Sequence, residues 1–144
     1  MLKDAPDHLD ADLILKLYDL RREAGLREAR DQLAREFWPK NAKEAVAVLD
    51  HGHPLNRVYR QVSTYWEMVY RMARHGIIHG DFLVENNAEG LLLFARVEPY
   101  LKEIRGAGGP HVFKNAEWVA HEVPEGRAIA DRMRARVKKA LDGK

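Results

Sequence analysis

Residues 54–76, PLNRVYRQVSTYWEMVYRMARHG, carry the clearest structural signal in the chain. Apolar side chains recur there at steps of three and four residues, which places them along one face of an α-helix. Pro54 suits the first turn of a helix, and Gly76 supplies the left-handed residue that ends one. We therefore expect a long central helix from Leu55 to His75 that organises the core. Its apolar positions are Leu55, Val58, Val62, Tyr65, Trp66, Val69, Met72 and Ala73.

Helical periodicity recurs on both sides of this segment, whereas β-branched residues nowhere alternate as a strand requires. After the central helix, Pro99 interrupts an apolar pattern from Leu91 to Ile104, which predicts a kink or a break there. The sequence thus predicts an all-α fold, an irregular bundle of about six to eight helices. The first helix is expected from near Asp7 to Glu23, with one apolar face formed by Leu9, Leu13, Leu17 and Leu20.

Length and composition narrow the class of protein. The 144 residues are close to the usual size of one domain, so we expect a single domain over residues 1–144. The net charge is +2, from 24 basic and 22 acidic side chains, which provides no overall field for nucleic acid. Without cysteine, neither a disulfide framework nor a thiolate metal site can form. No apolar run suits a signal peptide or a membrane span, so we expect a cytoplasmic protein without a cofactor.

Residues 79–86, HGDFLVEN, resemble the catalytic loop of aminoglycoside and choline kinases, in which Asn follows the Asp of His-Gly-Asp by five positions. The resemblance implies that Asp81 would accept the proton of the attacking hydroxyl and that Asn86 would bind magnesium. Helices precede this loop, however, where such kinases need a glycine-rich hairpin and a lysine-bearing strand. Asp is also a favoured helix cap, and we expect Asp81 to cap a short helix that reaches Asn86. Our expectation is a protein that is not an enzyme, with a phosphotransferase as the enzymatic alternative.

The seven histidines form no pattern typical of metal ligands. Gly76 separates His75 from His79, so the two rings do not share a helix face, and His121-Glu122 lacks the second histidine of zinc peptidases. We therefore expect no metal site.

The last helix is expected to begin at Pro124, and the side opposite its apolar face is basic. A basic amphipathic helix can bind nucleic acid or an anionic surface, and the candidate residues are Arg132, Arg136 and Lys139. Cations near a helix C-terminus also interact favourably with the helix dipole, and no aromatic residue is available here for base stacking. Such binding is therefore an alternative function.

From Phe37 to Glu122 the chain resembles a family of bacterial helical domains of unknown function. The landmarks are Tyr65-Trp66-Glu67, the turn Arg74-His75-Gly76-Ile77-Ile78 followed by Asp81, Phe94 before Pro99, then Arg105, and the segment Phe113 to Trp118. The resemblance implies a helical fold and brings no established activity.

Glu67 is the unusual residue among these landmarks, because it lies one step from the apolar face of the central helix. An unpaired carboxylate there would be costly. We therefore expect Glu67 to be partly buried and paired with Arg74 or Arg105.

The leading functional hypothesis is a non-enzymatic module for protein interaction or regulation. Its partner would be an unidentified protein or a second copy of the chain, in a homodimer. Aromatic side chains beside the apolar faces exceed what one small core is expected to bury, and they would be available for such contacts. These residues are Trp38, Tyr59, Tyr70 and Tyr100.

Overall fold

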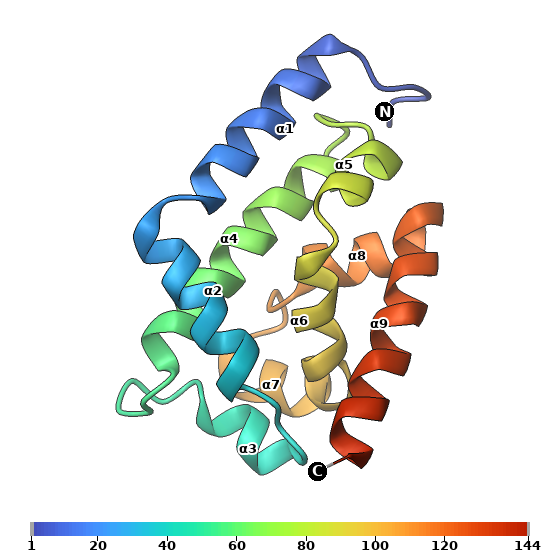
Figure 1. Ribbon diagram of the computed structural model, residues 1–144. Helices are drawn as coiled ribbons and strands as arrows, with labels where there is room; N and C mark the ends of the chain where they lie inside the picture. Colours follow the sequence, from blue (N-terminus) through green and yellow to red (C-terminus); the bar gives the residue numbers. More distant parts are fainter. Residues whose placement is uncertain (1, 144) are drawn as a thin grey trace.

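The computed structural model describes residues 2–143, so residues 1 and 144, at the ends of the predicted domain, lie outside the described residues. Between residues 2 and 143 there are helices and no strands, and the all-α prediction is confirmed (Figure 1). No helix in this part of the chain is long and apolar enough to cross a membrane. The helices are α1 (His8–Arg21), α2 (Ala24–Glu36), α3 (Ala42–Ala47), α4 (Asn56–Arg74), α5 (Gly80–Asn86), α6 (Glu89–Val97), the 3₁₀ helix η1 (Glu98–Tyr100), α7 (Leu101–Gly108), α8 (Lys114–Glu122) and α9 (Pro124–Asp142).

Helix α4 lies in the middle of the molecule and packs most extensively against α8 and α2. Its observed bounds, Asn56–Arg74, differ by one residue at each end from the predicted central helix. The face predicted to be apolar is the buried one, and Val62, Trp66 and Val69 are at most 3% exposed. Periodicity alone therefore located the helix that most of the core surrounds.

Two aromatic residues of α4 that we expected beside the core lie inside it. Tyr59 and Tyr70 are 4% and 0% exposed, so the prediction that they are available to a partner is wrong. The Tyr59 ring meets Phe37 and Phe113 edge-on, at centroid distances of 5.5 and 6.3 Å. The Tyr70 hydroxyl donates a hydrogen bond to the Asn87 carbonyl oxygen (2.7 Å), so its burial leaves no unpaired polar atom.

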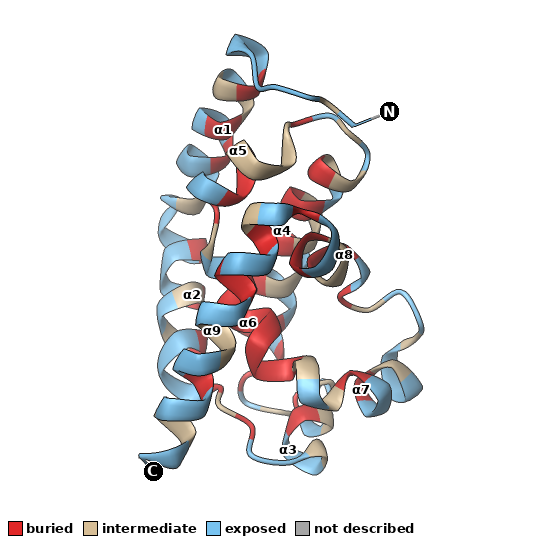
Figure 2. Cartoon of the chain, turned by 90° about the vertical axis from the view of Figure 1, so that its right-hand side faces the viewer, coloured by how far each residue is buried: buried red, intermediate tan, exposed pale blue. Residues whose placement is uncertain are grey.

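Helix α6 is buried on every side, and Figure 2 shows it as the reddest helix of the bundle. It contacts α9 most, and also α8 and α4. A helix that is apolar all round can be stable only inside a protein or a membrane. Gly90 allows its close approach to α4, since a Cβ there would lie 2.5 Å from the Tyr70 hydroxyl oxygen and 2.7 Å from Trp66 Cδ2.

The predicted break at Pro99 is confirmed. Helix α6 ends at Val97, η1 covers Glu98–Tyr100, and α7 begins at Leu101. Proline has no N–H to donate and its ring clashes with the carbonyl one turn earlier, so an α-helix cannot run straight through it. The change of direction brings α7 beside α3.

The buried face of α1 differs from the predicted one. The buried residues are Asp10, Ile14 and Leu17, whereas Leu9 and Leu20 are 62% and 52% exposed. Asp10 can be buried because its carboxylate accepts hydrogen bonds from Lys3 Nζ (2.8 Å) and from the Asp7 backbone N–H (3.1 Å). The prediction that all four leucines share the core face is therefore wrong, and part of the apolar surface of α1 remains exposed.

The contact between α8 and α9 gives a test of the packing. A Cβ on Gly126 would lie 2.1 Å from the Val119 carbonyl oxygen, so Gly126→Ala forces the two backbones apart. We expect it to lower the free energy of unfolding by about 1–3 kcal/mol. The matched control is Gly106→Ala in α7, where a Cβ meets nothing within 4 Å. This control should raise the stability by roughly 0.5–1 kcal/mol, because alanine favours the helix. Urea unfolding followed by circular dichroism measures both changes, and equal effects would contradict the close approach.

Candidate functional site

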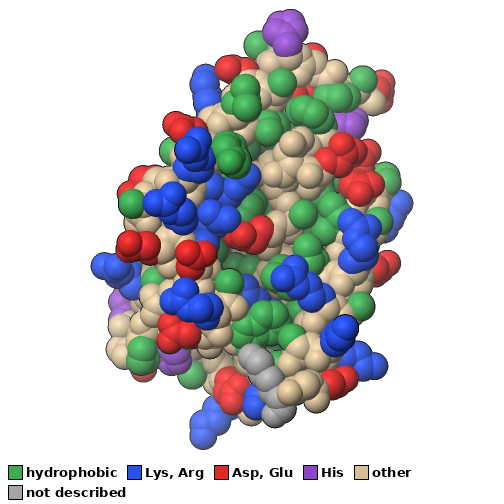
Figure 3. All heavy atoms as spheres, viewed as in Figure 1, with side chains coloured by type: hydrophobic (Ala, Val, Ile, Leu, Met, Phe, Trp, Pro, Cys, Tyr) green, Lys and Arg blue, Asp and Glu red, His purple; other side chains and the backbone are tan. Residues whose placement is uncertain are grey.

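A cavity of about 340 Å³ lies between α2, α4, α6 and α9. On the face shown in Figure 3, hydrophobic side chains lie between basic side chains on the α2 and α9 sides. The charged residues that line the cavity are Arg30, Arg96, Arg136 and Glu89, and we call it the arginine groove. Its apolar walls are formed mainly by Leu33, Val62, Trp66, Leu92, Leu93 and Met133.

Arg96 is the buried cation of this groove, with 5% of its surface exposed. Its Nη1 donates hydrogen bonds to the carbonyl oxygens of Leu33 (3.0 Å) and Phe37 (2.6 Å), at the C-terminal end of α2. The guanidinium also lies over the Trp38 ring, 4.9 Å from its centroid. The Nε atom is buried and has no hydrogen-bond partner within residues 2–143. Nη1, on one edge of the guanidinium, therefore donates hydrogen bonds within the protein, whereas Nε, on the other edge, donates none to the described residues.

The charge of Arg96 is only partly compensated. Burial lowers the pKa of Arg96 to about 10, while Glu89 raises this pKa and Arg136 lowers it. The guanidinium therefore remains charged at neutral pH. Among the described residues, no carboxylate forms a salt bridge with it. The carbonyls at the end of α2 carry a partial negative charge, which offsets only part of the cost of burying a full cation.

The other charged groups come from α2, α6 and α9. Arg30 forms a two-point contact with Glu89, in which Nε lies 2.7 Å from Oε2 and Nη2 lies 2.8 Å from Oε1. The hydrogen bond with Glu89 raises the pKa of Arg30. Arg136 lines the groove from α9 and is exposed to solvent. Three arginines against one glutamate, +3 and −1, leave an excess of two positive charges around the cavity.

This lining is suited to binding rather than to proton transfer or nucleophilic attack. Arginine stays protonated near neutral pH, and the Glu89 carboxylate is held by Arg30. Within residues 2–143, no three His, Asp or Glu side chains gather closely enough to hold a metal ion. What the groove offers is a partly compensated cation beside an apolar surface.

Glu67 is half-buried, as expected, but its partner is the start of α8. Its Oε1 accepts hydrogen bonds from the backbone N–H (3.1 Å) and the side-chain amide (3.2 Å) of Asn115, and Oε2 accepts one from the Ala116 N–H (2.8 Å). A helix N-terminus has unpaired N–H groups and a partial positive charge, so it can stabilise a carboxylate as an arginine would. Neither Arg74 nor Arg105 pairs with Glu67 in the described chain, which corrects the expected partner.

The two arginines make other contacts. Arg74 Nε donates to Asn115 Oδ1 (2.6 Å), so the Asn115 amide connects Arg74 to Glu67. Arg105 pairs with Glu117, with 3.0 Å between Nη2 and Oε1. Glu67, Arg74 and Arg105 therefore all contact α8, but no two of them form an ion pair with each other in the described chain.

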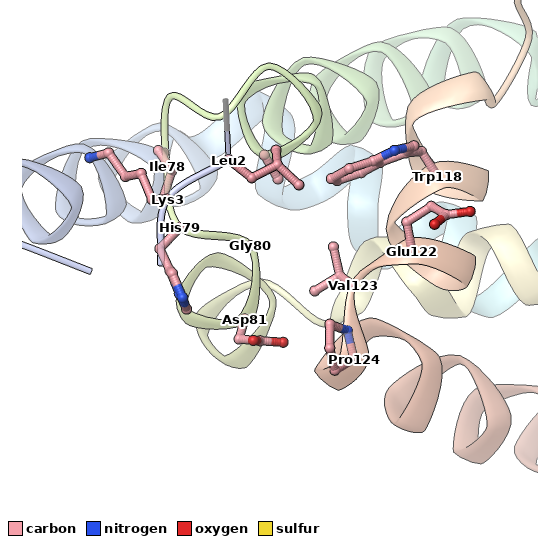
Figure 4. A pocket seen from close by; sticks show the side chains of 11 residues that line it. Leu2, Lys3, Ile78, His79, Gly80, Asp81, Trp118, Glu122, Val123 and Pro124 are labelled. Carbon is pink, nitrogen blue, oxygen red and sulfur yellow. The ribbon is translucent and has the colours of Figure 1, made fainter. Parts of the chain in front are cut away.

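The kinase-like segment borders a smaller cavity of about 100 Å³ (Figure 4). The Asp81 carboxylate points toward the start of α9, where Oδ1 accepts a hydrogen bond from the Glu125 backbone N–H (2.9 Å). His79 caps α5, since its Nδ1 accepts from the Phe82 N–H (3.2 Å). The prediction that Asp81 caps its own helix is therefore wrong, because it serves α9 instead.

Asn86, the second residue of the kinase-like pair, does not line this small cavity. Its side-chain amide donates to the Phe82 carbonyl oxygen (2.9 Å), one turn earlier in α5. Asp81 and Asn86 thus both make contacts that support helices.

Of the three basic residues singled out in α9, only Arg136 lines the arginine groove. Arg132 and Lys139 are exposed elsewhere on the same helix. The fold brings Arg136 together with Arg30 and Arg96, two residues that the sequence reading did not select. The signal that could have revealed Arg96 is its place in LLLFARV, residues 91–97, as the one charged side chain of an otherwise apolar helical segment.

The contact of Asp81 gives a prediction that separates a structural from a catalytic role. Asp81→Ala removes the acceptor at the start of α9 and should lower the free energy of unfolding by about 1 kcal/mol, as loss of a helix cap does. Asp81→Asn keeps an oxygen that can accept the same bond, so it should lose clearly less stability. Denaturant titrations measure both variants, and an Asp81→Ala variant as stable as the wild type would contradict the capping role. A phosphotransferase predicts instead that ATP with magnesium raises the melting temperature of the wild type and not of Asn86→Ala, which lacks the implied magnesium ligand.

Comparisons with known proteins identify a family for this chain but no relative of known activity. No curated protein and no solved structure matches the chain. A family model described as a domain of unknown function, DUF4760, matches residues 6–123. The match begins before the segment from Phe37 to Glu122 on which the sequence resemblance was based, and it includes α1 to α8. Because it covers most of the chain, the protein belongs to the DUF4760 family.

Proposed function

We propose that the protein is a non-enzymatic regulatory binding module whose arginine groove receives the anionic group of an effector. The observation that carries the proposal is Arg96, a cation that is 5% exposed and whose Nε–H has no partner within residues 2–143. A buried charge is tolerated when it is paired and hydrogen-bonded. An anion bound in the groove would supply both the opposite charge and the missing acceptor.

The size of the expected effect follows from the donors available. Each hydrogen bond between a charged donor and an anion contributes roughly 1.5–3 kcal/mol. Arg96 and Arg136 approach the cavity from α6 and α9, so one anion that contacts both would gain two such bonds. Solvent weakens the contribution of the exposed Arg136, whereas burial strengthens that of Arg96.

A regulatory role is favoured by where the groove lies. Its walls belong to α2, α4, α6 and α9, and α2 and α9 each pack on other helices more than on one another. A ligand held between Arg96 and Arg136 would add a contact between α6 and α9, which already pack on each other. Binding would thereby stabilise one arrangement of α9 over others, which is how a ligand shifts a conformational equilibrium.

Inorganic phosphate tests whether the groove binds anions. Phosphate replaces chloride stepwise at constant ionic strength. At a phosphate concentration ten times the dissociation constant, it should stabilise the wild type by roughly 1.4 kcal/mol. Arg136→Gln should reduce this shift in melting temperature several-fold, because it removes one of the two donors. Arg132→Gln is the matched control, an exposed arginine one turn earlier in α9 that does not line the groove. Equal stabilisation of all three proteins by phosphate would be a general salt effect and would contradict the proposal.

Self-association through α1 is a second candidate function, favoured by the apolar side chains that this helix leaves exposed. Leu9 and Leu20 are 62% and 52% exposed. Leu9, Leu13, Lys16 and Leu20 follow one another at steps of four, three and four, the spacing of a seam between paired helices. We propose a second copy of this chain as the occupant, because in a symmetric dimer the same exposed leucines of both copies would cover one another.

Size-exclusion chromatography with light scattering should therefore find a dimer at high protein concentration. The double substitution Leu9→Glu with Leu20→Glu places charges in the seam and should yield a monomer. Leu15→Glu is the control, since Leu15 is 67% exposed but lies outside this spacing and should leave the dimer intact. A monomeric wild type at the highest concentration would remove self-association.

A further inference from the structure

The chemistry of the arginine groove narrows the class of anion that it would take. We propose that its ligand is a small amphipathic monocarboxylate, a single carboxylate on an apolar body of on the order of ten non-hydrogen atoms. This inference rests on the proposed anion-binding function. It adds that the charged end of the ligand is a carboxylate and that the other end is apolar.

The free edge of Arg96 fits a carboxylate. Nη1 is occupied by the carbonyl oxygens of Leu33 and Phe37, and Nε is the unpaired donor. In a guanidinium, the Nε–H lies side by side with one N–H of Nη2, on the edge away from Nη1. Two parallel donors on a plane match the two oxygens of a carboxylate, which is the usual two-point contact of arginine with that group.

The groove favours a single negative charge over a doubly charged phosphate. Glu89 lines the same cavity, and its carboxylate is held there by Arg30 at 2.7 Å. A second negative charge on the ligand would meet this carboxylate. The oxygens of a phosphate that do not reach Arg96 or Arg136 would also face apolar walls, where they would lose water without gaining a donor.

The apolar body of the ligand would take the place of water against the groove walls. Leu33, Leu92 and Leu93 belong to the buried core and Met133 is partly buried, so a hydrocarbon there would meet aliphatic surface from α2, α6 and α9. The Met133 side chain is unbranched and adapts readily to a ligand's shape. The cavity of about 340 Å³ holds on the order of ten groups the size of a water molecule, at about 30 Å³ each. Octanoate, with a carboxylate and a seven-carbon chain, is a probe of this size.

Isothermal titration calorimetry with three probes separates the contributions of the two ends. Octanoate should bind at least about a hundredfold more tightly than acetate, because each buried methylene group contributes roughly fourfold in affinity. Octan-1-ol has the tail without the charge and should bind at least about tenfold more weakly than octanoate, because it cannot pair with Arg96. All titrations use the wild-type chain at concentrations at which octanoate forms no micelles.

Substitutions then locate the binding. Arg136→Gln should weaken octanoate several-fold, whereas Arg132→Gln should leave its affinity unchanged. Met133→Gln keeps the length of the side chain but makes the wall polar, so it should weaken octanoate and not acetate. Arg96→Met should abolish octanoate binding. If that variant does not fold, the Nε–H signal of Arg96 in the ¹H–¹⁵N spectrum of the wild type tests the same contact. That signal should shift on addition of octanoate.

The outcomes distinguish this inference from the function on which it rests. If phosphate binding depends on Arg136 but octanoate binds no more tightly than acetate, the groove binds anions and the proposal of an amphipathic ligand is wrong. If octanoate and octan-1-ol bind equally, the pairing of a carboxylate with Arg96 is wrong. If neither phosphate nor octanoate binds, the proposed function and this inference both fail.

Discussion

The contact of Gly90 with Trp66 and Tyr70 holds α6 against α4 at a distance that leaves no room for a side chain between them. Because residues 90–97 of α6 are buried and all but Arg96 are uncharged, the helix must be covered on its remaining sides, and α9 and α8 cover it. Pro99 interrupts the α-helix after Val97, and the chain changes direction through η1 into α7. The positions of three of the groove's walls therefore follow from how α6 is packed.

Charged side chains reach across the bundle to the ends of helices that their own loops do not cap. The residues that precede α8 and α9, Phe113 and Val123, have apolar side chains and cannot accept hydrogen bonds from the first backbone N–H groups. Glu67 of α4 provides the acceptors for α8, and Asp81 of α5 provides one for α9. These caps are tertiary contacts, so the helices are stabilised in one particular arrangement.

Local rules predicted much of the fold and little of the groove. The periodicity of α4 and the effect of Pro99 depend only on backbone geometry, so the sequence was sufficient for both. It was insufficient for α1, because this helix is apolar on more than one side and its buried face includes Asp10, whose pairing with Lys3 the periodicity does not reveal. Arg136 was selected as part of a basic helix, but that Arg30 and Arg96 lie with it around one cavity depends on how α2, α6 and α9 pack.

The hydrogen bonds from Arg96 to α2 explain why a long side chain with an N–H donor stands at this position. They do not explain why that side chain is charged. An uncharged side chain with an amide could donate to the Leu33 and Phe37 carbonyl oxygens without the cost of burying a cation. The partial negative charge at the end of α2 offsets some of that cost, and Glu89 contributes at longer range. What remains is a positive charge whose Nε–H has no partner in the part of the chain that the structure describes, beside a cavity to which Arg136 adds a second cation. Because no described carboxylate forms a salt bridge with this buried charge, we propose that its counter-ion is a ligand bound in the arginine groove.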